Sequence, residues 1–189
     1  VKDGVSERGG FPVIKKPMMQ WSMRTTAFAE RLLNGLNHVD WSESLKIMQR
    51  NWIGRSEGAR VFFGLKGRTD SLEIFTTRPD TIFGATFMVL APEHPLVYEL
   101  TIPAQHDLMF DYANETSKAS EQDRLNAQKM MTGVFTGSYA VHPFTGEDIP
   151  IWVSNYVLIE YGTGAIMAVP AGDERDRRFA ERFDLKISE

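Results

Sequence analysis

The sequence contains the stretch LEIFTTRPDTIFG, which runs from Leu72 to Gly84. Its first half is rich in β-branched and aromatic residues, which predicts a strand that continues to about Thr77. Pro79 then ends the strand, and Asp80 is interpreted as the cap of a short helix. That structural interpretation does not explain why several hydroxyls and an arginine gather at one strand end, where binding sites are common. The structural and the binding interpretations therefore both stay open.

A second stretch, YGTGAIMAVPAGDERD, runs from Tyr161 to Asp176. Its apolar run at 165–169 predicts a buried strand. Asp173 and Asp176 lie three positions apart at the start of a helix predicted from Glu174, which is typical of an N-cap with an acidic N3 partner. The helix dipole favours carboxylates there. A carboxylate at a helix start beside a pocket can also hold a cationic amine, so two interpretations stay open here as well.

The rest of the chain predicts a mixed α+β fold around these two stretches. Apolar and β-branched runs predict short strands at 61–63, 72–77, 87–90, 134–135, 139–141 and 149–153, the last three joined in a hairpin. Helical spacing predicts helices at 18–36, 43–51, about 105–131 and from 174 onward. The boundary between a helical first part and a strand-rich second part is predicted near residues 51–58.

Composition excludes several classes of function. The 189 residues include no cysteine, which excludes disulfides, thiolate catalysis and cysteine-ligated zinc. The four histidines are scattered without metal-ligand spacing, so no metal is expected. A net charge of -4 argues against a broad phosphate-binding face, so any contact with nucleic acid should be small or shared with another domain. No apolar run suits a membrane span, and we expect a cytoplasmic protein. The missing initiator Met predicts a fragment.

Two motifs resemble known signatures but lack their context. Residues 54–58 match the G-x-S-x-G pattern of a serine hydrolase, whose serine must follow a strand and precede a helix. Here a helix is predicted before the motif and a strand after it, so the match is interpreted as a junction. Residues 162–164 form a Gly-Thr-Gly loop, but no phosphate-binding Gly-Lys-Ser/Thr follows.

Four segments resemble signatures of the bacterial leucyl-tRNA synthetase family, at 51–59, 75–84, 89–97 and 162–170. Asp80 distinguishes the chain from valyl enzymes, which usually carry Glu there. The Arg-Pro pair before it distinguishes the chain from isoleucyl enzymes.

The resemblance implies a domain organisation. Residues 50–189 would form the inserted editing domain, a β-barrel-like core flanked by helices and truncated at its C-terminal return. Residues 1–49 would be a helical segment of the synthetase body.

The activity implied by this resemblance is hydrolysis of misacylated tRNA(Leu). A hydrophobic synthetic site rejects an analogue that differs by one methylene only about 10- to 200-fold, so a second site must remove errors. The expected substrates are norvalyl, isoleucyl and methionyl esters, whereas leucyl-tRNA(Leu) would be spared. The expected partner is the tRNA(Leu) 3′ end with its attached amino acid. No binding to DNA or to a membrane is expected, and the protein is expected to be monomeric. Editing would need no cofactor, because ATP serves only the parent leucine-tRNA ligase.

The resemblance also implies roles for individual residues. Asp176 would hold the substrate ammonium group, whereas Thr76 and Thr77 would position water or the developing oxyanion. Thr81 would block the leucine side chain. The remaining substrate-binding residues would be Arg78, Tyr161, Met167, Val169 and Asp173.

One position departs from the family pattern. The family usually carries His where this chain has Gly172. The departure leaves room for an alternative in a different class, a module that binds the tRNA end or a partner without hydrolysing anything. Turnover of a misacylated tRNA separates the two.

Overall fold

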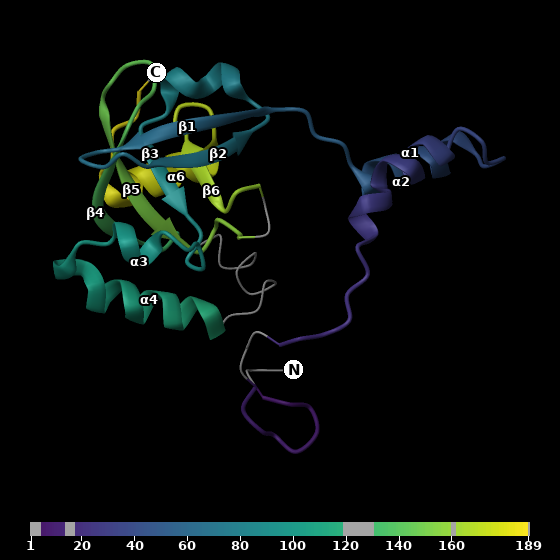
Figure 1. The fold of residues 1–189 in the computed structure, drawn as a ribbon, viewed down its shortest axis with the longest axis horizontal. Coiled ribbons are helices and arrows are strands. Elements are labelled where there is room, and N and C mark those ends of the chain that lie inside the picture. The colour runs from purple at the N-terminus through teal and green to yellow at the C-terminus, as the bar shows by residue number, and fades with distance from the viewer. Residues whose placement is uncertain (1–4, 14–17, 119–130, 160–161, 189) are drawn as a thin grey trace. The chain divides into compact units, whose positions relative to one another are not determined.

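The computed structural model describes residues 5–13, 18–118, 131–159 and 162–188. The chain divides into two compact units, one of residues 16–57 and one of residues 1–15 together with 58–189. Figure 1 shows helices in the first unit and a sheet with flanking helices in the second.

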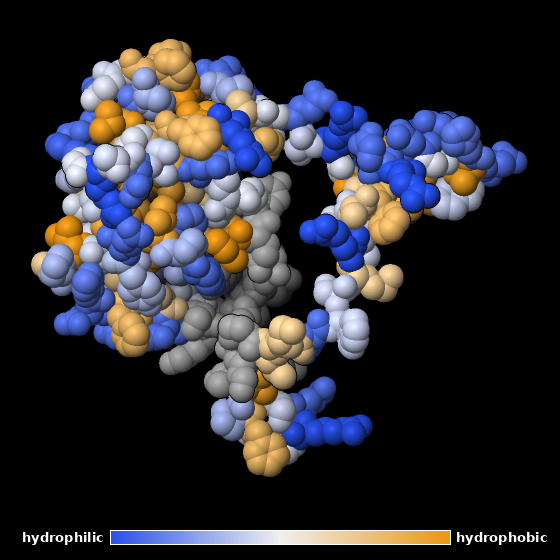
Figure 2. All heavy atoms as spheres, viewed as in Figure 1, coloured by the Kyte–Doolittle hydropathy of each residue, from blue (hydrophilic) through white to orange (hydrophobic). Residues whose placement is uncertain are grey.

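The smaller unit contains a 3₁₀ helix, η1 (Thr25–Phe28), and the α-helices α1 (Ala29–Gly35) and α2 (Glu43–Ile53). The first helix was expected from residue 18 but begins at Thr25. Leu36 alone is buried among the described residues of this unit, and Figure 2 shows polar and apolar side chains mixed on its visible surface. Its exposed apolar residues include Met19, Trp21, Met48 and Trp52.

The larger unit is built on one six-stranded sheet. Its strands are β1 (Ala59–Leu65), β2 (Ser71–Thr76), β3 (Phe87–Leu90), β4 (Gly133–Val141), β5 (Asp148–Ser154) and β6 (Ala165–Ala168). The spatial order is β2-β1-β4-β5-β3-β6, and every neighbouring pair is antiparallel except β3 with β5. The edge strands β2 and β6 come close to each other, but the sheet stays open. The α+β class is confirmed, with an open mixed sheet in place of a closed barrel.

Strand β3 lies between β5 and β6, and its residues are buried on both faces of the sheet because a core cluster packs on each face. Its side chains alternate between the two faces, as strand geometry requires. Met88 and Leu90 join the larger apolar cluster, which also contains Phe63. Phe87 and Val89 join a second cluster. The sheet therefore separates two layers of core, each of which removes apolar surface from water.

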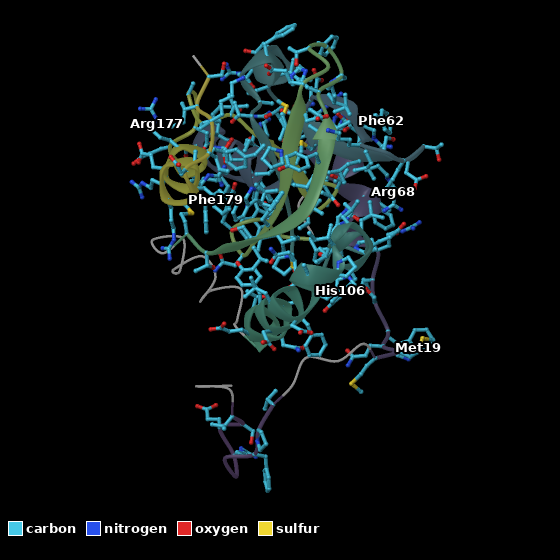
Figure 3. All side chains as sticks on the ribbon, turned by 90° about the vertical axis from the view of Figure 1, so that its left-hand side faces the viewer. Met19, Phe62, Arg68, His106, Arg177 and Phe179 are labelled. Atoms are coloured by element: carbon cyan, nitrogen blue, oxygen red, sulfur yellow. The ribbon has the colours of Figure 1, made fainter. Side chains whose placement is uncertain are left out.

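Helix α6 (Glu174–Phe183) covers one face of this sheet. Phe179 and Ala180 are fully buried in the second cluster, and Phe183 packs against it, as predicted from their spacing. The Phe179 ring stacks on Phe87 with ring centroids 5.4 Å apart. Figure 3 shows Phe179 turned towards the sheet, whereas Arg177 lies on the outer side of the helix.

The remaining elements are short or lie at one end of the sheet (Figure 1). Helix α3 (Val97–Leu100) and the 3₁₀ helix η3 (Pro103–Gln105) lead into α4 (His106–Lys118). Residues 119–130 of the predicted helix at 105–131 lie outside the described residues. The 3₁₀ helix η2 (Pro79–Gly84) connects β2 to β3 and carries the first candidate site segment.

Candidate functional site

The structure brings together the two stretches that the sequence singled out. At one end, Gly162 lies beside β2, so that a Cβ atom placed on it would be 3.8 Å from Cβ of Phe75. At the other end, a Cβ atom on Gly84 would be 3.0 Å from Cγ1 of Val169. Between them, the Thr86 amide donates to the Ala168 carbonyl at 3.1 Å. The end of β2 with η2 and the segment around β6 therefore form one continuous region.

The strand end presents two threonines to this region. Thr76 is half-buried, and its Oγ1 accepts a hydrogen bond from the Arg78 amide at 3.0 Å. Thr77 follows the last residue of β2 and is exposed. Because the Thr76 hydroxyl accepts from the backbone, its own proton stays free to be donated to a bound group.

Arg78 and Asp80 form an exposed bidentate ion pair. Nε of Arg78 lies 3.0 Å from Oδ1 of Asp80, and Nη2 lies 2.9 Å from Oδ2. The hydrogen bonds from Arg78 lower the pKa of the Asp80 carboxyl. The interpretation of Asp80 as a helix cap is wrong, because η2 begins at Pro79 and the Asp80 side chain binds Arg78 instead.

Thr81 is half-buried, and its hydroxyl is turned back onto its own helix. Oγ1 of Thr81 donates to the Arg78 carbonyl at 2.9 Å, and the Thr81 amide donates to the same carbonyl at 3.2 Å. Buried His142 fixes the next residue, since its Nδ1 accepts from two backbone amides and its Nε2 therefore donates to the Ile82 carbonyl at 2.9 Å. The Thr81 hydroxyl is therefore engaged within η2, and its Cγ2 methyl makes no hydrogen bond.

Asp173 caps helix α6, as the sequence predicted. Its Oδ1 accepts from the amides of Arg175 at 2.8 Å and Asp176 at 3.2 Å. The second half of the predicted cap is wrong, because the Asp176 carboxylate does not return to the Asp173 amide. Oδ2 of Asp176 accepts from the Val169 amide at 2.8 Å, and Oδ1 accepts from the Tyr156 hydroxyl at 3.2 Å.

Asp176 is a buried carboxylate, with only 5% of its surface exposed. Burial raises its pKa to about 6, and the charge of Asp173 adds to that effect. The hydrogen bonds from Val169 and Tyr156 and the charge of Arg175 oppose it. Above pH 6 the group is therefore mainly an anion, and each carboxylate oxygen has acceptor capacity beyond the one hydrogen bond described for it.

The other predicted site residues occupy different environments. Met167 is buried in the larger core cluster, opposite Met88 on the neighbouring strand. Val169 is half-buried and packs against that cluster. Tyr161 lies outside the described residues. Tyr156 was missed by sequence reasoning, because it lies in a turn after β5 where no periodic pattern marks it.

The remaining sequence motifs contribute no site. Ser56 lies between α2 and β1, so the strand-before-helix context of a nucleophile elbow is absent. Within the described ranges, no three His, Cys, Asp or Glu side chains are grouped so that they could hold a metal ion. The same part of the chain has no helix of the length and apolarity needed to cross a membrane.

Position 172 has room for the side chain that the family usually carries. A Cβ atom on Gly172 would meet Val169 Cγ1 at an ordinary contact distance of 3.8 Å. Gly172→His is therefore expected to change the free energy of unfolding by less than about 0.5 kcal/mol in urea denaturation.

Gly164→Ala is the matched control for this substitution. Gly164 has φ of +73°, and an added Cβ would lie 2.6 Å from Cδ1 of Ile159. The Gly164→Ala substitution should therefore lower the free energy of unfolding by more than about 1 kcal/mol. Equal losses for the two variants would show that position 172 lacks the expected space.

Comparisons with known proteins agree on one family. The family model described as "Leucyl-tRNA synthetase, editing domain" matches residues 50–189. A leucine–tRNA ligase of Flavobacterium johnsoniae is 61% identical over 183 residues, which are 97% of this chain and 19% of the relative. The crystal structure of a LeuRS–tRNA–LeuAMS ternary complex from Agrobacterium radiobacter matches with a TM-score of 0.80 and 37% identity, over 99% of this chain and 23% of that one.

These matches first define the class, which is that of aminoacyl-tRNA synthetases with an editing domain. Because the family model covers well over half of the sequence, the chain belongs to the leucyl-tRNA synthetase family and contains its editing domain. The chain spans about a fifth of the length of the curated relative it matches.

Proposed function

We propose that this chain hydrolyses the ester that links a non-cognate amino acid to the 3′ end of tRNA(Leu). The substrates are norvalyl-, isoleucyl- and methionyl-tRNA(Leu), and leucyl-tRNA(Leu) is spared. The observation that carries the proposal is Asp176, a carboxylate that is 5% exposed and ends the second of the two converging stretches. A buried anion with free acceptor positions suits the ammonium group that every aminoacyl ester presents.

In this mechanism the ester carbonyl lies near the end of β2. Water adds to the carbonyl carbon and the bond to the tRNA oxygen breaks. The tRNA oxygen leaves as a hydroxyl with one water proton, the other proton goes to solvent, and the amino acid leaves as its carboxylate. The hydroxyls of Thr76 and Thr77 position that water or stabilise the developing oxyanion. An aminoacyl ester is already labile, so positioning and electrostatics suffice without a metal or a covalent nucleophile.

Further residues bind the substrate around these groups. Arg78 is exposed and can contact the phosphates of the tRNA end. Thr81 limits the side-chain space, and Val169 with Tyr161 and Met167 shapes the pocket wall. Asp173 supports the site by capping the helix that carries Asp176. Any activation of leucine with ATP belongs to a longer, cytoplasmic ligase, and the editing unit acts as a monomer.

The test is release of labelled isoleucine from isoleucyl-tRNA(Leu) by this chain and by Asp176→Ala. We expect hydrolysis by the unchanged chain and a loss of at least about 100-fold in the variant, because an unpaired ammonium group would be left in a buried site. Asp148→Ala is the control, since that carboxylate is exposed on β5 and pairs with Lys66. Binding of the tRNA without turnover would instead favour the non-catalytic module.

A further inference from the structure

Tyr156 is the only neutral side chain among the described residues that hydrogen-bonds to the Asp176 carboxylate. Its hydroxyl donates to Oδ1 at 3.2 Å, while the Val169 amide donates to Oδ2 at 2.8 Å. The two donors come from different segments, the turn after β5 and the residue that follows β6. Each oxygen is therefore held by a separate donor, which leaves the carboxylate one orientation.

The Tyr156 ring is fixed independently of its hydroxyl. The residue is 6% exposed and belongs to the second core cluster. Its ring meets Phe179 edge-on, with centroids 5.6 Å apart. Burial, together with the nearby Asp176 charge, raises the pKa of the phenol well above its usual value. The hydroxyl thus stays protonated and can only donate to the carboxylate.

We propose that Tyr156 is a positioning residue for Asp176: its hydroxyl holds the carboxylate ionised and directs its remaining acceptor positions at the substrate ammonium group. The inference rests on the proposed function, because it assigns Asp176 an ammonium ligand. The charged groups that face Asp176 also affect the ionisation of its carboxyl. Asp173 and Arg175 lie at the start of α6, and the Val169 amide, directly after β6, is the one backbone donor described for the carboxylate.

The test is Tyr156→Phe, which removes the hydroxyl and keeps the ring in its packing. A hydrogen bond to a charged acceptor stabilises that charge. Loss of the Tyr156 hydrogen bond should therefore raise the pKa of Asp176 by about one pH unit. The titration is followed by ¹³C NMR of the carboxyl carbon, whose resonance is identified by its absence in Asp176→Asn. In parallel, kcat/KM for isoleucyl-tRNA(Leu) is measured as a function of pH. The apparent pKa of the acid limb of this profile should rise by the same amount.

Tyr139→Phe is the matched control, because Tyr139 lies on β4 and its ring contacts Phe135. It should leave both readouts unchanged. A second variant carries 3-fluorotyrosine at position 156, which is a stronger donor and should lower the pKa of Asp176. A role of Tyr156 in packing alone would not move the pKa in opposite directions in the two variants.

The outcomes separate this inference from the proposed function. An unchanged Asp176 titration in Tyr156→Phe overturns the inference, whatever the activity. If the unchanged chain fails to hydrolyse the ester, the proposed function fails, but the NMR titration still decides whether Tyr156 holds Asp176 ionised. A shifted titration with a matching shift in the acid limb supports both.

Discussion

Replacing Asp176 with Asn is expected to abolish hydrolysis and, at the same time, to stabilise the fold above pH 6. Under the proposed function, the catalytic loss follows because a neutral amide cannot form an ion pair with the substrate ammonium group. The gain in stability follows because the wild-type protein must ionise a buried carboxylate at neutral pH. Asn nearly matches Asp in shape, and its oxygen can accept from Val169 while its NH₂ group donates to Tyr156.

The size of this gain depends on pH. Burial raises the pKa of Asp176 from 3.8 to about 6, so between these values the native state holds a proton that the unfolded chain has released. Wild-type stability therefore falls as pH rises through this window. Two pKa units correspond to about 3 kcal/mol. Asp176→Asn should be more stable by up to that amount at pH 8, and the difference should vanish near pH 4.

Urea denaturation at a series of pH values measures this effect. Asp173→Asn is the matched control, because Asp173 lies at the same helix start but has a lowered pKa. Burial opposes ionisation of Asp173, but hydrogen bonds from Asp176 and Arg175 together outweigh it and lower the pKa, so its neutralisation should not stabilise the protein at pH 8. If Asp176→Asn has no higher stability than wild type at pH 8, burial does not dominate the energetics of Asp176.

The second large effect concerns Thr81. Its hydroxyl donates to the Arg78 carbonyl, so under the proposed function we expect the methyl group to be the part of the side chain that excludes leucine. Thr81→Ser keeps the hydrogen bond and removes the methyl group, whereas Thr81→Val keeps a branched shape and removes the hydroxyl. Relief of an overpacked contact of about 1–3 kcal/mol corresponds to about 5- to 150-fold faster hydrolysis of leucyl-tRNA(Leu).

Hydrolysis of leucyl- and isoleucyl-tRNA(Leu) is measured side by side for wild type, Thr81→Ser, Thr81→Val and Thr81→Ala. We expect the Thr81→Ser and Thr81→Ala variants to hydrolyse the leucyl ester and the Thr81→Val variant to spare it. The wild type and all three variants should hydrolyse the isoleucyl ester. Leucyl hydrolysis by Val but not by Ser would show that the hydroxyl carries the discrimination. Equal sparing by all four would place the specificity element elsewhere.

Local sequence patterns were sufficient for most of the individual elements. The β4–β5 hairpin was predicted because alternating apolar residues flank Thr145 and Gly146, and the structure pairs these strands. The apolar face of α6 was predicted from the spacing of Phe179, Ala180 and Phe183. Local patterns are informative here because each records the burial of one face of one element.

Long-range pairings could not be predicted in the same way. Nothing within residues 87–90 shows that they pair with β5 in parallel and with β6 in antiparallel fashion. Contacts within the site between residues far apart in the sequence could not be predicted either. The cap by Asp173 was local and was predicted, whereas Tyr156 lies 20 positions from Asp176 and meets it only through the fold.

The central place of β3 has a consequence for how the chain reaches its native state. Its two partners, β5 and β6, begin at Asp148 and Ala165, long after β3 itself ends at Leu90. During synthesis this apolar strand therefore remains without its two neighbouring strands until β5 and β6 have been synthesised. Closing such long loops slows folding and leaves an unpaired strand open to aggregation. The region around Asp176 is accordingly expected to form last, at the end of a slow refolding reaction.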